Sequence, residues 1–124
     1  MTIYEAITRV DGLKFNTYTQ EEKILWLSEL DGSIKHQILD KHEGGDQIAF
    51  GGYGPDTDPK TVLLVGAPFD AVYLRWVEAQ IDYHNGEYEK FNASIILYNT
   101  ALEAFANYYK QTHRPVSRGS RFVF

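Results

Sequence analysis

The chain has 124 residues, of which 44% are hydrophobic and 15% aromatic, and it contains no cysteine. This length and composition predict one domain with its own core, and exclude disulfides, thiolate metal sites and cysteine nucleophiles. The formal charge of −5 is uneven. Lys110, Arg114, Arg118 and Arg121 give the segment after Glu103 a charge of +4, whereas the remainder has 8 basic and 17 acidic groups, a net −9. Such an acidic body argues against general binding of duplex DNA, which needs clustered basic side chains.

Two helices are expected in the first third of the chain. The first should run through about residue 10, where Asp11-Gly12 ends it, and the second through about residue 42. Gly32 lies inside the second helix at a cost of about 1 kcal/mol relative to alanine, so a close crossing or a kink is expected there. Each helix begins with a capping box, in which a threonine precedes a glutamate by three residues: Thr2 with Glu5, and Thr19 with Glu22.

Residues 43–67 are rich in glycine and proline, which break helices. The apolar runs 48–50 and 61–65 are expected to pair as a short β-hairpin or to form an extended loop insertion. A two-stranded ribbon is marginal in water, so it needs the helices or a partner strand to cover it. Because loops of this length are commonly functional, its aromatic residues Phe50 and Tyr53 are candidate interface residues.

Residues 68–115 predict a helical hairpin, with Pro68 at the first helical position and Asn85-Gly86 as the turn. Apolar residues recur on the second helix at alternating spacings of three and four, as in heptad a and d positions. This aromatic seam is typical of packing and assembly, because tyrosine can bury its ring and keep its hydroxyl in water. The seam consists of Tyr88, Phe91, Ile95, Tyr98, Leu102, Phe105 and Tyr109.

No catalytic constellation is evident, so we expect no enzyme, no cofactor and no metal site. His36 and His42 are six residues apart, which is not the spacing of a helical ligand pair. Asp56-Thr57-Asp58 matches the opening of a calcium loop but lacks its later glycine and glutamate. The glycines at 51–54 are not followed by the lysine and helix of a phosphate-binding loop.

The C-terminal residues 116–124 form a basic arm that ends in Arg-Phe-Val-Phe. A basic arm on an acidic body predicts docking on an acidic surface of a neighbouring copy or of another protein. The alternative is a terminus that is basic by chance. The candidate interface residues in this arm are Arg118, Arg121, Phe122 and Phe124.

Most of the chain resembles small proteins of tailed bacteriophages that infect Gram-positive hosts, in the head–tail connector (adaptor) group. The segments that carry the resemblance are 6–11, 23–32, Leu64-Val65, 68–70 with Tyr73, 78–83, 85–87, Tyr98-Asn99, Tyr108-Tyr109 and 113–115. The resemblance implies a mostly helical subunit of a ring beneath the portal, with DNA passing through its channel. It also implies contacts of the arm with a neighbour or the portal, and of residues 43–67 with an adjacent subunit or the next tail component.

The sequence therefore predicts a mostly α fold, a small bundle of about four helices, with a single domain at 1–115 and the arm at 116–124. The expected role is a non-enzymatic virion assembly protein, made in the bacterial cytoplasm, that forms a homo-oligomeric ring and binds the portal and the next neck protein. No signal peptide and no membrane span are expected. The alternatives are another neck or tail-completion protein, a small regulatory protein-binding module, or a small hydrolase that uses the 43–67 loop.

Overall fold

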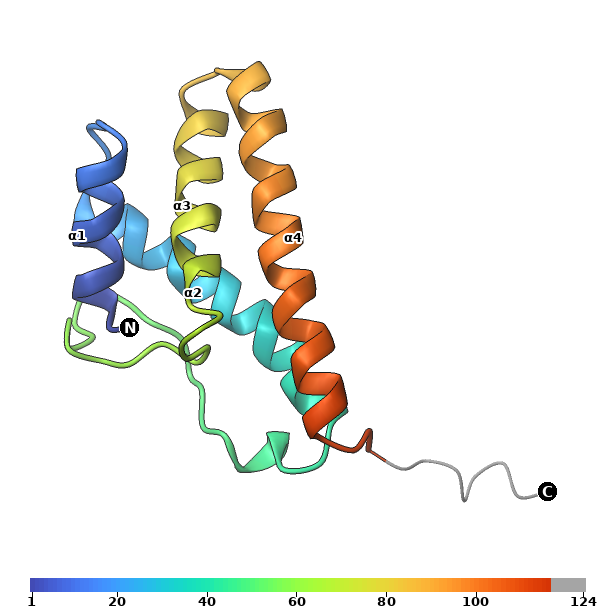
Figure 1. Ribbon diagram of the computed structural model, residues 1–124. Coiled ribbons are helices and arrows are strands. Elements are labelled where there is room, and N and C mark those ends of the chain that lie inside the picture. The colour runs from blue at the N-terminus through green and yellow to red at the C-terminus, as the bar shows by residue number, and fades with distance from the viewer. Residues whose placement is uncertain (117–124) are drawn as a thin grey trace.

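The computed structural model describes residues 1–116 and confirms the expected small, mostly α bundle. Figure 1 shows α1, α3 and α4 roughly side by side, with α2 crossing behind them at a steep angle. No helix of the described residues is both long and apolar enough to cross a membrane. The elements are α1 (Ile3–Leu13), α2 (Gln20–Gln37), η1 (Leu39–Lys41), η2 (Gly45–Gln47), α3 (Ala71–His84) and α4 (Tyr88–Thr112).

Both predicted capping boxes are present at the starts of α1 and α2. The Thr2 hydroxyl accepts a hydrogen bond of 3.1 Å from the Glu5 amide, and the Glu5 carboxylate accepts one of 2.9 Å from the Thr2 amide. Thr19 and Glu22 repeat the arrangement. The ends of the helices differ from expectation: α1 continues to Leu13, and α2 stops at Gln37 before the short 3-10 turn η1.

The core lies where α1, α2 and α3 meet. Each helix contributes residues at helical spacing, and burial of one such side chain stabilises the fold by about 1.5–3 kcal/mol. The Trp76 indole N–H on α3 also donates 2.8 Å to the Trp26 carbonyl on α2, which ties the crossing helices together. The buried residues include Ile3, Ala6, Ile7 and Val10 of α1, Leu27, Leu30 and Ile34 of α2, and Val72, Tyr73, Val77 and Ile81 of α3.

The β-hairpin expected within 43–67 is wrong, because the runs 48–50 and 61–65 do not pair with each other in the described structure. The second run instead lies along the start of α1: the Ile3 amide donates 3.0 Å to the Thr61 carbonyl, and the Leu63 amide donates 2.9 Å to the Met1 carbonyl. The first backbone N–H groups of α1 have no partner within the helix. They bond instead to carbonyl groups of residues 59–61, which a paired strand would otherwise have used. The outcome is an extended insertion with a single isolated bridge between Thr2 and Val62.

The helical hairpin of α3 and α4 confirms the predicted turn, where Gly86 has the left-handed φ of 75°. Pro68 is not the first helical position: α3 begins at Ala71 with Asp70 as its N-cap, and the Ala67-Pro68 peptide is cis. The predicted seam is buried at Tyr98, Phe105 and Tyr109. Its first residue, Tyr88, is 60% exposed and lies beside the turn, at the start of α4.

Candidate interaction surface

A buried carboxylate holds the 43–67 insertion against the helices. Asp31 on α2 is fully buried, and its oxygens accept hydrogen bonds from the Tyr53 hydroxyl (2.5 Å), the Tyr73 hydroxyl (2.6 Å) and the Leu64 amide (3.1 Å). The Tyr73 hydroxyl in turn accepts 2.7 Å from the Val65 amide. We call these five residues the Asp31 cluster. It joins α2, α3 and two points of the insertion.

The pKa values in the Asp31 cluster are set mainly by burial, and no basic side chain contributes to the pKa of Asp31. Desolvation raises the pKa of Asp31, although the two hydroxyl donors and the Leu64 amide act in the opposite direction. Burial and the neighbouring carboxylate also raise the pKa of Tyr53 and of Tyr73 above the ordinary tyrosine value. Both phenols therefore stay protonated and act as donors, so the cluster holds the insertion in place and supplies no nucleophile.

A second buried carboxylate, Asp82 on α3, ties the hairpin to the α1–α2 connector. It accepts 2.7 Å from the Lys14 ammonium and 2.5 Å from the Ser94 hydroxyl of α4. The Glu87 amide also donates 3.0 Å to the Asp82 backbone carbonyl. Asp82 is thus fully engaged in intramolecular contacts, as Asp31 is.

The two candidate interface residues of the insertion are partly used inside the molecule. Tyr53 is half-buried, and its hydroxyl belongs to the Asp31 cluster. Phe50 is half-buried and packs edge-on against Tyr53 at a ring-centroid distance of 5.1 Å. A Cβ at Gly32 would lie 3.6 Å from the Phe50 ring, so the close approach expected at this glycine comes from the insertion and not from a helix. Contact with a partner at Phe50 or Tyr53 stays a prediction.

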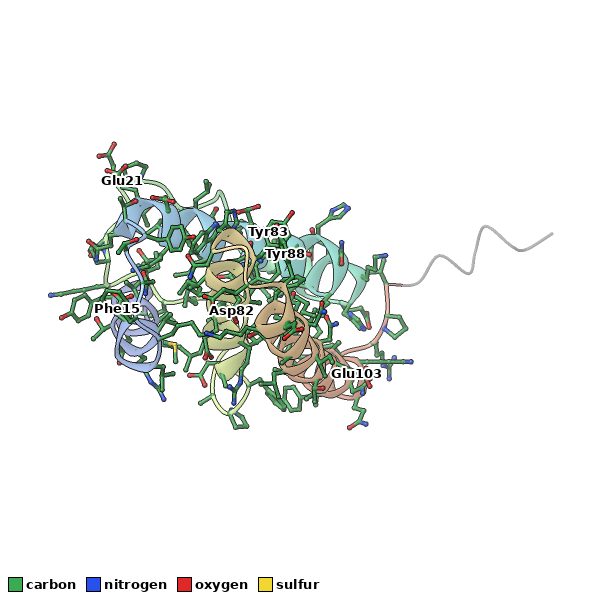
Figure 2. All side chains as sticks on the ribbon, turned by 90° about the horizontal axis from the view of Figure 1, so that it is seen from above. Phe15, Glu21, Asp82, Tyr83, Tyr88 and Glu103 are labelled. Atoms are coloured by element: carbon green, nitrogen blue, oxygen red, sulfur yellow. The ribbon has the colours of Figure 1, made fainter. Side chains whose placement is uncertain are left out.

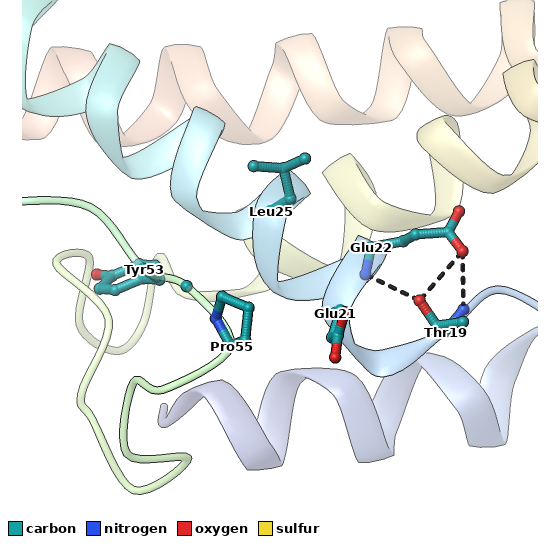
Figure 3. A pocket seen from close by; sticks show the side chains of 7 residues that line it. Thr19, Glu21, Glu22, Leu25, Tyr53 and Pro55 are labelled. Carbon is teal, nitrogen blue, oxygen red and sulfur yellow. Dashed lines mark hydrogen bonds between the residues drawn. The ribbon is translucent and has the colours of Figure 1, made fainter.

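A cleft of about 440 Å³ opens between the start of α2 and the insertion. Figure 3 shows its lining, in which Glu22 is held by the Thr19 capping box and Glu21 stands beside Pro55. The Glu22 carboxylate accepts hydrogen bonds from Thr19, so it is part of the helix cap, and Glu21 is the other carboxylate of the lining. The lining residues are Thr19, Glu21, Glu22, Leu25, Tyr53, Gly54 and Pro55.

Three of the four histidines make local contacts with the backbone, and His36 is exposed on α2. A ring nitrogen of His42 lies 2.7 Å from the Ile38 carbonyl, and a ring nitrogen of His84 lies 2.8 Å from the Gln80 carbonyl. His113 makes the same contact with Tyr109 at 3.2 Å and stacks on its ring at 3.7 Å. Within residues 1–116, no group of three or more His, Asp or Glu side chains is arranged to hold a metal ion.

One exposed apolar area is the side of α4 that faces away from α3. We call it the α4 outer face. Ile96 is 62% exposed, Leu97 49% and Tyr108 45%. The exposed apolar residues recur at helical spacing on the side opposite the seam, and this pattern is already present in the sequence. The residues of this face are Ala93, Ile96, Leu97, Thr100, Ala104, Asn107, Tyr108 and Gln111, all of them exposed.

A second apolar area is formed by Leu13 at the end of α1 and Phe15 in the α1–α2 connector, which we call the connector edge. Leu13 is 64% exposed and Phe15 is 88% exposed. Figure 2 shows Phe15 on one side of the molecule and Glu103 of α4 on the other, and Figure 1 likewise places α1 and α4 at opposite edges. The protein therefore presents exposed apolar side chains on two opposite sides.

The four candidate interface residues of the basic arm, Arg118, Arg121, Phe122 and Phe124, lie outside the described residues. Val116, the first residue of the arm, lies beside η1, because its amide donates 2.9 Å to the Lys41 carbonyl and the Glu43 amide donates 2.7 Å to the Arg114 carbonyl. These two hydrogen bonds hold residues 114–116 against the segment that follows α2.

Comparisons with protein-family models, curated proteins and solved structures found no match to this chain.

Proposed function

We propose that this protein is a non-enzymatic virion assembly protein of the head–tail connector type, which forms a ring between the phage portal and the next neck or tail component. The observation that carries the proposal is the presence of exposed apolar side chains on two opposite sides, the connector edge and the α4 outer face. A ring subunit needs two different contact surfaces, one for each neighbour. Exposed apolar areas are a common feature of protein–protein contact surfaces.

The internal hydrogen bonds of the buried carboxylates also support an assembly role. Asp31 and Asp82 are satisfied by internal hydrogen bonds, and their partners come from elements far apart in sequence. Buried networks of this kind make a bundle rigid and specify one arrangement of its helices. A rigid subunit with preformed surfaces loses little conformational entropy on assembly. The acidic body suits a DNA channel in which the nucleic acid slides without binding.

The resemblance described above supplies the partner, the portal. The proposal is tested by mixing the purified full chain with the portal protein encoded in the same genome and examining the mixture by sedimentation and negative-stain electron microscopy. We expect co-sedimentation and an added ring at one end of the portal. A chain that sediments separately from an intact portal, at every ratio tried, would overturn the proposed function.

A matched pair of surface variants sharpens this test. Phe15→Ser removes the aromatic ring of the connector edge, and Leu25→Ser removes an exposed side chain elsewhere, on α2. Both residues are exposed, so both variants should retain the wild-type circular dichroism spectrum and melting temperature. We expect Phe15→Ser to reduce ring formation at least tenfold, and Leu25→Ser to leave it unchanged.

A further inference from the structure

The α4 outer face lacks the charges that a water-exposed helix normally has. Between Phe91 and Tyr109, Glu103 is the only charged side chain of α4. Neither α1 nor α2 covers this face, since its large side chains Ile96 and Leu97 are about half exposed or more. Amphipathic surface helices place charged residues opposite their buried stripe, whereas a helix that is apolar on two faces is usually covered on both.

The charges at the two ends of this face are opposite in sign. Glu89 is in the first turn of α4, and Lys110 is in the last turn, with Arg114 shortly after it. Among residues 1–116, none of these three side chains forms an ion pair. Glu89 and Lys110 are 21 positions apart, or about 32 Å along the helix, so they cannot meet within one chain. An antiparallel second copy of α4 would bring each beside the other.

The sizes of the side chains match the same antiparallel register. With a two-fold axis near Thr100, the numbers of facing residues add up to about 200, so Ile96 of one copy lies opposite Ala104 of the other, Leu97 opposite Glu103 and Ala104, and Tyr108 opposite Asn92 and Ala93. An alanine thus lies opposite or next to the position opposite each large side chain, which lets the two helices approach closely. The Thr100 hydroxyl donates 3.0 Å to the Ile96 carbonyl of its own helix, so its polar group is satisfied and its methyl group is free to pack.

We propose that, in the free protein, the α4 outer face is covered by the same face of a second copy, with the two α4 helices antiparallel about a two-fold axis near Thr100. The pairing does not rest on the proposed virion role. A two-fold pair and a ring have different symmetry, so the pair belongs to the protein in solution and is exchanged for other contacts when a ring forms.

A single helix pair buries less than the roughly 800 Å² per partner of a standard interface. We therefore expect a weak dimer, with a dissociation constant of about 10–100 μM. Sedimentation equilibrium of the full chain up to about 500 μM should show monomer and dimer in this range. A chain that remains monomeric throughout would overturn the proposal.

Engineered cysteines test the register, because the natural chain has none. Facing residues of close helices lie within the Cα separation that a disulfide bridges. Under mild oxidation, Thr100→Cys should cross-link with itself. Asn99→Cys is the matched control, since it is exposed on the same helix but turned about 100° away, and it should not cross-link.

The direction of the helices needs a second pair of variants, since a parallel pair would also join Thr100→Cys. Ala93→Cys alone should give no cross-link, whereas a mixture of Ala93→Cys and Asn107→Cys should give the mixed dimer. Cross-linking of Ala93→Cys with itself would show parallel helices and overturn the proposed geometry. Equal cross-linking of Thr100→Cys and Asn99→Cys would also overturn it, because the contact would then not be specific to one face of α4.

A charge exchange gives an independent readout in solution. Glu89→Lys and Lys110→Glu, taken singly, should each weaken dimerisation about threefold to tenfold at low salt. The double variant should return it to near the wild-type value, because the exchanged charges again face each other between copies. A double variant weaker than both single variants would contradict the pairing. If the dimer forms as proposed but the portal is not bound, the proposed function fails while this inference stands.

Discussion

The Tyr73 hydroxyl donates a hydrogen bond of 2.6 Å to the Asp31 carboxylate, from a position 42 residues later in the chain. This contact joins α3 to α2, and the same carboxylate also binds the Tyr53 hydroxyl and the Leu64 amide of the insertion between them. One buried side chain thus helps to fix where a long segment with little regular secondary structure lies on the bundle.

Replacing Asp31 by alanine should destabilise the protein by about 3–5 kcal/mol, because three buried donors lose their acceptor. That is a large part of the stability of a domain of this size. Urea unfolding followed by circular dichroism measures the change. Asp46→Ala is the control, since Asp46 is exposed and should change stability by less than about 0.5 kcal/mol. Equal effects of the two variants would show that the Asp31 cluster is not important for stability.

Asp31 should also give the protein a specific pH dependence. Its pKa in the folded state is raised by burial above the unfolded value, so the folded state binds the proton more tightly. The stabilisation from the protonated form is fully present below the unfolded pKa and is lost as the pH rises through the folded pKa. The stability of wild type relative to Asp31→Asn should therefore fall as the pH rises above about 4.

Measuring this difference, and not the stability of wild type alone, removes the contribution of other carboxylates. The pKa of Glu5 is lowered by its hydrogen bonds to Thr2, and the pKa of Glu87 by its hydrogen bond to Lys90, so both act with the opposite sign. Urea unfolding of both proteins at several values between pH 3.5 and pH 7 would suffice. If the stability of wild type relative to Asp31→Asn increased with rising pH, the raised pKa of Asp31 would be contradicted.

Removing the cation beside Asp82 should also destabilise the fold. Lys14→Met keeps the aliphatic part of the side chain but leaves the buried Asp82 carboxylate with Ser94 as its remaining side-chain partner. We expect a loss of about 2 kcal/mol, less than for a fully buried pair because Lys14 is partly exposed. Thermal unfolding provides the measurement. Lys60→Met, at an exposed lysine, should leave the melting temperature unchanged.

Two glycines should respond to alanine in opposite directions. A Cβ at Gly45 would lie 1.8 Å from the Leu39 carbonyl oxygen, so Gly45→Ala must displace η1 or η2 and should destabilise the protein by more than about 2 kcal/mol. Gly12 lies within α1 with no atom in reach of a Cβ, so Gly12→Ala should stabilise it by about 0.5–1 kcal/mol. Denaturant midpoints of the two variants, compared with wild type, give the signs directly.

Several elements follow from local sequence alone. The capping boxes of Thr2 and Thr19 fix the starts of α1 and α2, because a threonine and a glutamate three residues later satisfy backbone donors within one turn. Gly86 ends the α3 segment for the same kind of reason, since its left-handed backbone is accessible to glycine at little cost. Such signals depend on neighbours a few residues away and can be recognised without the fold.

The helical bundle and its long C-terminal hairpin are thus encoded locally, because capping and helical periodicity act over a few residues. The path of residues 61–65 along the start of α1 and the role of Asp31 as acceptor for the insertion depend on the tertiary structure. It also decided that the side of α4 opposite the seam stays exposed. These outcomes depend on which backbone donors and side-chain volumes remain free after the helices have packed, and no local pattern records that.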